Sequence, residues 1–220
     1  MSAEKLQEGI VYLIALVLSI CVHEWGHAIV ADKLGDPTPR SQGRVTLNPL
    51  AHIDPIGTLL LPAMMVFTGI PLLGWGKPVF TNPNRYTRRM SMHRAGMLVA
   101  AAGPAMNFVF AVVMSVALLV AFKLGAVGPL GDGLQKIILM NFSLMCFNLL
   151  PIPPLDGGTV LKGFLPREHH HYLEPLERYG FIVLLLVVMT PQVMRVLMTP
   201  AAYLANAWFG ALGWVAAAIS

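Results

Sequence analysis

Apolar residues occur in long runs that short polar segments separate. The first run, Gly9 to Val22, contains 14 uncharged residues and continues to Ala31, before the turn residues Gly35-Asp36-Pro37. A run of this length predicts a membrane-spanning helix, because about 20 mostly apolar residues cross the hydrocarbon of a bilayer. Together the runs predict helices over 9–31, 95–122, 134–150, about 180–190 and about 196–217, the second of them interrupted at Gly103-Pro104.

Two segments depart from this pattern. Residues 55–73 are apolar but contain three prolines and two glycines, which favours a broken or re-entrant element over a straight span. Residues 43–49 are bounded by glycine at one end and proline at the other, and they predict a short β segment centred on Val45–Leu47.

The composition is that of a membrane protein. Of 220 residues, 56% are hydrophobic and 12% are charged, and the mean hydropathy of +0.66 excludes an ordinary soluble domain. The net charge of +4 is modest, and no basic run with interleaved aromatic residues predicts a nucleic-acid partner. We therefore expect an all-α polytopic membrane protein with the lipid bilayer as its surroundings. It forms a single domain over 1–220, with a core at about 9–165 and a C-terminal helical pair at about 172–217.

The distribution of basic residues predicts how the chain crosses the membrane. If residues 55–73 do not cross, the division of Lys and Arg between the two sides is 11 against 4, and if they cross it is 9 against 6. The positive-inside bias favours the first arrangement, in which 55–73 is re-entrant, the N-terminus lies outside and 77–94 lies in the cytoplasm. We therefore expect a multi-pass protein of the cell membrane.

Residues 23–27 of the first run, His-Glu-Trp-Gly-His, carry the strongest chemical signal. On a helix, His23 and His27 lie one turn apart on one face and can bind one metal ion, with Glu24 on nearly the same side. This is the His-Glu-x-x-His pattern of zinc hydrolases, in which the glutamate is the general base. Ionisable groups inside an apolar span are costly and are usually retained for function, so packing alone is a poor explanation.

Catalytic zinc usually has three protein ligands and one open position. The soluble schemes for a third ligand fail here, because no glutamate lies between Glu24 and Glu168, and Val30 and Lys33 occupy the positions of an extended histidine motif. Asp156 is the best remaining carboxylate, since it follows an apolar helix within a Pro- and Gly-rich break. The alternative is that Asp156 only caps a short helix beginning at Gly157.

Three motifs together resemble the signatures of the site-2 protease family of intramembrane zinc metalloproteases. They are His23-Glu24-x-x-His27, Gly103-Pro104-Ala-Met-Asn107, and Asn148-Leu-Leu-Pro-Ile-Pro-Pro-Leu-Asp156-Gly157. The resemblance implies a core of three transmembrane helices that carries one Zn²⁺, with His23, His27 and Asp156 as ligands and Glu24 as the base. It also implies cleavage of membrane-spanning substrate proteins. No insertion is long enough for the PDZ domain of some members, and no C-terminal nucleotide-sensing domain follows, so a compact form is expected.

Two asparagines complete the predicted site. Asn148 falls where the family has an asparagine implicated in substrate or oxyanion contacts, whereas Asn107 either lines the substrate path or bonds a neighbouring helix. Residues 154–157 read Pro-Leu-Asp-Gly where many members have Asn-Pro-Asp-Gly, so the local backbone is expected to differ. With the metal site towards the cytoplasmic side, we expect hydrolysis of peptide bonds in or near transmembrane segments. The segment Val45–Leu47 would hold an extended substrate by edge pairing. The alternatives are a membrane metal transporter and a pseudoprotease that binds helices without cutting them.

Overall fold

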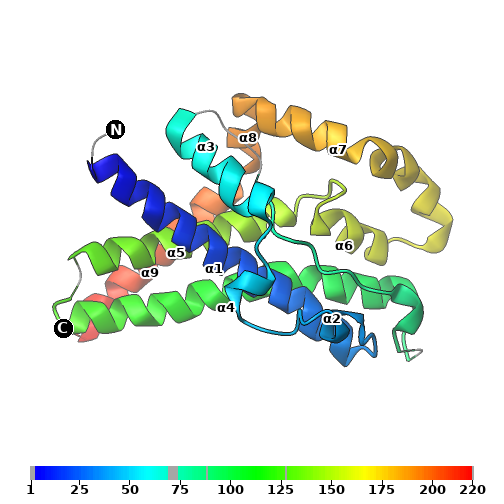
Figure 1. Cartoon of the computed structure of the whole chain (residues 1–220), viewed down its shortest axis with the longest axis horizontal. Helices are drawn as coiled ribbons and strands as arrows, with labels where there is room; N and C mark the ends of the chain where they lie inside the picture. Colours follow the sequence, from blue (N-terminus) through cyan, green and yellow to red (C-terminus); the bar gives the residue numbers. More distant parts are fainter. Residues whose placement is uncertain (1–2, 69–73, 88, 127, 220) are drawn as a thin grey trace.

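The computed structural model describes residues 3–68, 74–87, 89–126 and 128–219, and these residues form helices joined by turns, without a β-strand among them (Figure 1). The five longest helices correspond to the five apolar runs, which confirms those predictions. They are α1 (Ala3–Lys33), α4 (Met92–Lys123), α5 (Gly128–Asn148), α7 (Glu174–Met189) and α9 (Thr199–Ile219). Helix α1 ends where Gly35 adopts a φ of +101°, a left-handed conformation that favours glycine.

The core consists of α1, α4 and α5, as the sequence predicted. Helix α4 packs against both neighbours and runs antiparallel to each (Figure 1). Small residues allow the close approach of α1 and α4, since a Cβ added to Gly26 would lie 2.6 Å from the carbonyl oxygen of Ala102. The expected interruption at Gly103-Pro104 is wrong, because α4 continues through Pro104. A proline removes only one helical hydrogen bond, and the packing on both sides of α4 holds the helix together.

Shorter elements connect the core helices. They are α2 (Thr38–Ser41), α3 (Leu61–Thr68), α6 (Asp156–Phe164), α8 (Pro191–Leu197), a π-helix (Pro55–Leu60) and 3₁₀ helices at Pro49–Ala51, Pro83–Arg85 and Arg167–Leu173. The predicted C-terminal pair is thus three helices, because α7 and α8 meet at a bend of 99°.

The predicted β segment at 43–49 is wrong. In its place the chain turns: the Thr46 side chain accepts a hydrogen bond from the Asn48 amide, and the Asn48 side chain caps the 3₁₀ helix by accepting from Leu50. These local side-chain bonds satisfy the backbone without a neighbouring strand. The proposed pairing of a substrate with Val45–Leu47 therefore has no strand edge to use.

The apolar segment that begins at Pro55 returns to its starting point. Its entry and exit are joined by hydrogen bonds, from the Trp75 amide to the Gly57 carbonyl (3.1 Å) and from the Thr58 hydroxyl to the Trp75 carbonyl (2.8 Å). The apolar helix at Pro55–Met65 is too short to cross a bilayer, and α3 lies beside the N-terminal half of α1 (Figure 1). This geometry is that of a re-entrant element; residues 69–73 of the predicted segment lie outside the described residues.

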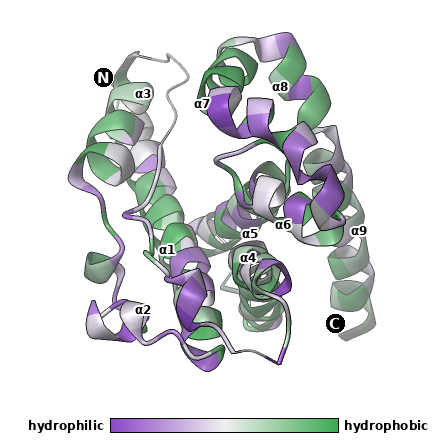
Figure 2. Ribbon diagram, turned by 90° about the vertical axis from the view of Figure 1, so that its right-hand side faces the viewer, coloured by the Kyte–Doolittle hydropathy of each residue, from purple (hydrophilic) through white to green (hydrophobic). Residues whose placement is uncertain are grey.

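Among the described residues, α1, α4 and α9 are long and apolar enough to cross a membrane, and the bent pair α7–α8 provides up to one more crossing. Large hydrophobic side chains are exposed on the outer surfaces of α7 and α9, among them Phe181, Leu186 and Trp214. Figure 2 shows α1 and α3 on one side of α4 and α5, and α6 to α9 on the other. Both chain ends lie at one end of the bundle, and the polar segment 77–94 runs to the opposite end (Figure 1).

Candidate metal centre

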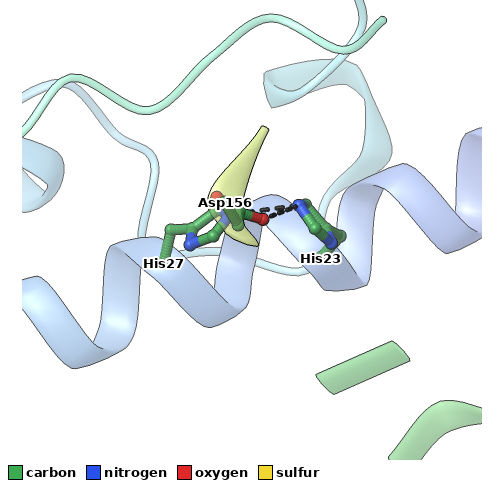
Figure 3. A group of neighbouring side chains, drawn as sticks. All are labelled: His23, His27 and Asp156. Carbon is green, nitrogen blue, oxygen red and sulfur yellow. Dashed lines mark hydrogen bonds and ion pairs between the residues drawn. The ribbon is translucent and has the colours of Figure 1, made fainter. Parts of the chain in front are cut away.

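Three side chains from two distant segments meet at one point inside the bundle. His23 and His27 project from one face of α1, and Asp156 reaches them from the first position of α6 (Figure 3). The Nε2 atoms of the histidines are 3.0 Å apart, and Asp156 Oδ2 lies 3.2 Å from that of His23 and 3.4 Å from that of His27. The three predicted ligands therefore converge, and their side chains are between 10% and 18% exposed.

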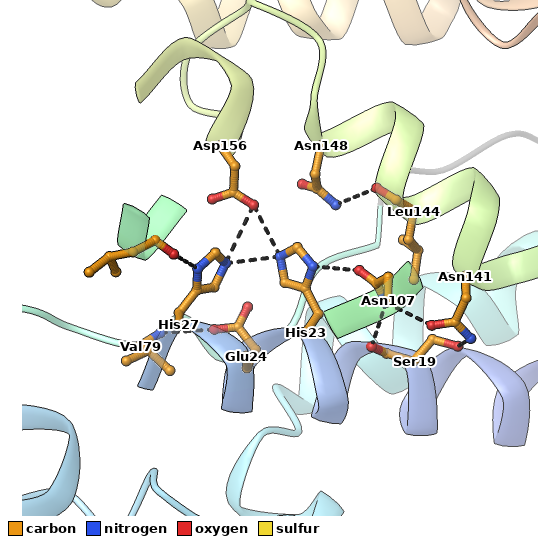
Figure 4. A network of polar contacts seen from close by, with 11 residues as sticks. Ser19, His23, Glu24, His27, Val79, Asn107, Asn141, Leu144, Asn148 and Asp156 are labelled. Carbon is orange, nitrogen blue, oxygen red and sulfur yellow. Dashed lines mark hydrogen bonds and ion pairs between the residues drawn. The ribbon is translucent and has the colours of Figure 1, made fainter. Parts of the chain in front are cut away.

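The outer nitrogen of each imidazole determines its tautomer. His23 Nδ1 lies 2.6 Å from Asn107 Oδ1, and His27 Nδ1 lies 2.7 Å from the carbonyl oxygen of Val99 (Figure 4). Because a carbonyl oxygen only accepts, each Nδ1 carries a hydrogen, so that Nε2 is the nitrogen whose lone pair can face inwards to a metal ion.

The two Nε2 lone pairs and the Asp156 carboxylate thus converge on one point, an arrangement that a bound cation stabilises. Ligands about 2.05 Å from a tetrahedral zinc are about 3.3 Å from each other, and the observed separations of 3.0 to 3.4 Å match this spacing. The donor set of two imidazoles and one carboxylate is also that of catalytic zinc. The residues present therefore fit the expected Zn²⁺.

Helix α4 supplies both outer hydrogen-bond partners from a single stripe. Val99, Gly103 and Asn107 are four residues apart and lie on the face that meets the histidines. A Cβ on Gly103 would lie 2.7 Å from His23 Cε1 and 2.5 Å from His27 Cε1, so only glycine leaves room for both rings. In the motif Gly-Pro-x-x-Asn, the glycine thus leaves space for two imidazoles, and the asparagine one turn later accepts a hydrogen bond from His23.

Asp156 does not cap the helix it begins. The N-cap position of α6 belongs to Leu155, and no side chain caps that end. The close packing of the α6 start against the turn that follows α5 requires Gly157, where a Cβ would collide with the carbonyl oxygens of Leu149 and Leu150. The Asp156 carboxylate is thus directed towards the histidines and not towards its own backbone. Of the two interpretations of Asp156, metal ligand and helix cap, these contacts favour the metal ligand.

Glu24 lies on the same side of α1 as the imidazoles, and its Oε2 accepts a hydrogen bond from the Val79 amide at 3.0 Å (Figure 4). Behind this segment lies Arg44, which is 4% exposed and donates to the carbonyl oxygens of Ala51 and Lys77. Burial lowers the pKa of Arg44, and the negative charge of Glu24 offsets part of this shift. Arg44 was not among the predicted site residues, and no sequence pattern around it could have identified its role.

Two cavities follow the interface between α1 and α5. One of about 380 Å³ borders His23, Glu24 and Asn148. The other, of about 720 Å³, continues along the same two helices towards the N-terminal end of α1; its lining is Glu8, Gly9, Tyr12, Ala15, Lys136, Leu139, Met140 and Ser143. Asn148 thus borders the space beside the metal centre, while its Nδ2 donates to the Leu144 carbonyl at 2.9 Å.

Asn107 is placed differently. Its side chain is fully buried, its Oδ1 faces His23, and its Nδ2 bonds Ser19 and Asn141 on the neighbouring helices. Asn107 was expected either to line the substrate path or to bond a neighbouring helix. Its contacts favour the second interpretation, and it borders neither cavity along α1 and α5. Asn141 and Ser19 were missed, because no motif in the sequence marks them.

Comparisons with known proteins agree with this geometry. The model of peptidase family M50 matches residues 126–190. The Bacillus subtilis (strain 168) protein named "Putative zinc metalloprotease YwhC" is 37% identical over 185 residues, which cover 81% of this chain and 80% of that protein. Two proteins named "Putative zinc metalloprotease Rip2" are also similar. The one from Mycolicibacterium smegmatis is 33% identical over 182 residues (81% of this chain, 66% of the relative), and the one from Mycobacterium tuberculosis strain H37Rv is 30% identical over 202 residues (90% and 70%).

No solved structure matches the chain. The identity to the Bacillus subtilis protein over four fifths of both chains shows the family, and the apolar helices show that the protein is a membrane protein. The chain belongs to peptidase family M50, the site-2 protease family, and is a zinc metalloprotease of the membrane.

Proposed function

We propose that this protein hydrolyses peptide bonds in or near transmembrane segments of membrane-protein substrates, with Glu24 as the general base. The observation that carries the proposal is the convergence of two Nε2 lone pairs and one carboxylate oxygen at 3.0 to 3.4 Å, with Glu24 on the same face of α1. His23, His27 and Asp156 would hold one Zn²⁺. When bound, zinc supplies Lewis acidity to a water molecule and to the carbonyl of the scissile bond.

The residues of the chain account for the proton transfers. Glu24 Oε2 is held by the Val79 amide, which fixes the direction of the carboxylate. Its other oxygen, Oε1, takes the proton of the attacking water and then gives it to the departing amine.

The two cavities along α1 and α5 provide a path for the substrate. A substrate helix lying against the larger cavity would direct its end into the smaller one, beside Glu24 and Asn148. Because the carbonyl groups of a helix are bonded internally, the substrate must unwind before cleavage. The segment 75–79, whose Val79 amide holds Glu24, is extended: the alternate amides of Trp75, Lys77 and Val79 all donate to the protein. The opposite edge of an extended segment faces away from these bonds, so it favours an extended substrate chain beside it.

The proposed setting is the cell membrane, with the active site towards the cytoplasm. His23 lies 10 residues before the end of α1 at Lys33, about 15 Å along the axis. The metal centre is thus nearer to the end of the bundle that carries the basic segment 77–94. The positive-inside bias places that end in the cytoplasm.

Two alternatives are weaker. A metal transporter needs ligands at several depths, whereas the described residues contain one group of three converging His, Cys, Asp or Glu side chains. A pseudoprotease that only binds helices has no use for a glutamate directed to the face of the metal ligands. Both alternatives remain outcomes of the experiment below.

The test uses purified, zinc-loaded protein and a panel of single-span membrane substrates. The wild type should release fragments, and Glu24→Gln should bind one zinc per chain without cutting, because an amide cannot accept the proton. Equal cleavage by both proteins would refute the role of Glu24. Zinc binding without cleavage of any substrate by the wild type would favour a non-cleaving protein.

A further inference from the structure

A fully buried polar cluster joins the three core helices on the side of His23 that faces away from the metal ligands. It consists of Ser19 on α1, Asn107 on α4 and Asn141 on α5, each 0% exposed (Figure 4). Buried polar groups at a meeting of three apolar helices are costly unless every donor finds an acceptor.

Every amide hydrogen of the cluster has an acceptor. Asn107 Nδ2 donates to the Ser19 carbonyl (3.1 Å) and to Asn141 Oδ1 (2.8 Å). Asn141 Nδ2 donates to Ser19 Oγ (2.8 Å) and to the Ile137 carbonyl (2.8 Å). The Ser19 hydroxyl donates in turn to the Ala15 carbonyl at 2.7 Å. Every donor of the cluster thus has an acceptor, and the side-chain hydrogen bonds lead from Asn107 through Asn141 and Ser19 to the Ala15 carbonyl.

This completeness fixes the orientation of both amides. A backbone carbonyl only accepts, so the Asn107 atom facing Ser19 must be the nitrogen, and the Asn141 atom facing Ile137 must be the nitrogen as well. Asn107 therefore presents its oxygen to His23 Nδ1. A reversed Asn107 would present N–H groups and favour the tautomer whose Nε2 hydrogen occupies the metal position.

We propose that Asn141 and Ser19 are positioning residues for the zinc site. They act through Asn107. Asn141 Oδ1 accepts one amide hydrogen of Asn107, and the backbone carbonyl of Ser19 accepts the other. The hydroxyl oxygen of Ser19 accepts from Asn141 Nδ2 and thereby orients Asn141. The same bonds join α5, the helix that leads into the Asp156 turn, to α1, which carries both histidines. The cluster thereby aligns the third ligand with the other two. The inference rests on zinc ligation as proposed above, and it needs no substrate for its test.

The experiment measures the zinc affinity of the purified full chain in detergent, by competition with a chelator. Asn107→Leu and Asn141→Leu should each weaken zinc binding by about 10- to 100-fold, as is typical of groups that orient a metal ligand. In the double variant the combined loss should be smaller than the product of the two single losses, because Asn141 acts in part through Asn107. Losses that multiply, or an unchanged affinity in Asn141→Leu, would overturn the proposal. A wild type that binds no zinc would instead refute the proposed function.

A second variant separates positioning from folding. Asn141→Asp keeps an oxygen facing Asn107 and should retain more zinc affinity than Asn141→Leu. In the metal-free protein, ¹⁵N-histidine NMR should show that the Nδ1 hydrogen of His23 is protected from exchange with water in the wild type, because it is bonded to Asn107, and that this protection falls in Asn141→Leu. Unchanged protection in that variant would contradict the mechanism, even if its stability falls.

Ser115→Ala is the matched control. Ser115 is 2% exposed and lies on α4 two turns beyond Asn107. Its hydroxyl donates to the Ala111 carbonyl (2.7 Å) and accepts from Trp208 Nε1 (2.8 Å). Its loss removes comparable buried bonds at a distance from the metal ligands. We expect a lower Tm and an unchanged zinc affinity; an equal loss of zinc affinity would show that any buried polar deletion has this effect and would overturn the assignment.

Discussion

Replacing Gly103 by alanine tests the geometry of the metal centre with a single methyl group. Gly103 lies opposite both histidines, in the middle of the α4 stripe. The added Cβ would stand 2.5 Å from His27 Cε1 and 2.7 Å from His23 Cε1, whereas ordinary contacts begin near 3.4 Å. At least one ring, or the helix itself, must therefore move by about 0.7 to 0.9 Å.

A displacement of this size is large for a metal site, where ligand distances hold to within about 0.2 Å. Overpacking a well-packed interior costs about 1 to 3 kcal/mol. If the rings can relax only when the metal leaves, this strain weakens zinc binding by about 5- to 150-fold, at 1.4 kcal/mol for each factor of ten. Gly103→Ala should thus lose zinc while it keeps its helices.

Gly96→Ala is the matched control, because it makes the same change on the same helix at a position where an added Cβ meets nothing within 4 Å. An alanine in a helix stabilises it by about 0.5 to 1 kcal/mol relative to glycine. Elemental analysis of zinc, chelator competition and thermal unfolding should be measured on both variants. Wild-type zinc affinity in Gly103→Ala would refute the packing of the two imidazoles against this residue.

Three further predictions address the third ligand, the proposed substrate path and the loop that follows α1. Asp156→Asn should lower zinc occupancy, since asparagine is a poor neutral ligand; full occupancy by elemental analysis would place the third ligand elsewhere. Ser143→Trp should fill part of the 720 Å³ cavity and slow cleavage of single-span substrates while zinc content stays normal, and unchanged cleavage rates would exclude this path. Asp36 is buried; burial raises the pKa of its carboxyl, but hydrogen bonds from Thr38 and Asn82 outweigh this and bring it below 3.8. The stability gained is therefore complete above about pH 4 and is lost as the pH falls through the lower folded-state pKa. Asp36→Asn should lower the free energy of unfolding by about 1 to 3 kcal/mol at neutral pH. A difference in Tm between the wild type and this variant that does not narrow in acid would contradict the role of the Asp36 carboxylate.

The sequence predicted the parts of the structure that depend on local spacing. The five long apolar runs became the five long helices, because the cost of exposed backbone leaves few other structures for such runs. The four-residue separation of His23 and His27 placed both on one face of α1. Asp156 was predicted from its place in a Pro- and Gly-rich break after an apolar helix and from the resemblance to the site-2 protease family, and the structure brings it within 3.4 Å of both histidines.

The errors occurred where contacts between distant segments decide the structure. Residues 43–49 have the composition of a strand, but Thr46 and Asn48 bond their own neighbours and no partner strand lies beside them in the described chain. The positioning contacts of Ser19 and Asn141 depend on how α1 and α5 are aligned, which no local pattern reports. Arg44 was missed for the same reason, since its acceptors lie 7 and 33 residues further along the chain.

The metal centre itself explains why the core helices have only one favourable alignment. On α4, Gly103 lies between the Val99 carbonyl and the Asn107 side chain, which accept hydrogen bonds from the histidines. The position of Gly103 has no room for a side chain. Sliding α4 by one turn, about 6 Å, would bring Val99 or Asn107 to the place of Gly103 and drive a side chain into the imidazoles. It would also separate His23 from its acceptor and leave the amides of the buried cluster without partners. Apolar helices in lipid slide past one another at little cost, because lipid is as apolar as their side chains. The residues that orient the metal ligands therefore also supply the specificity that apolar packing lacks.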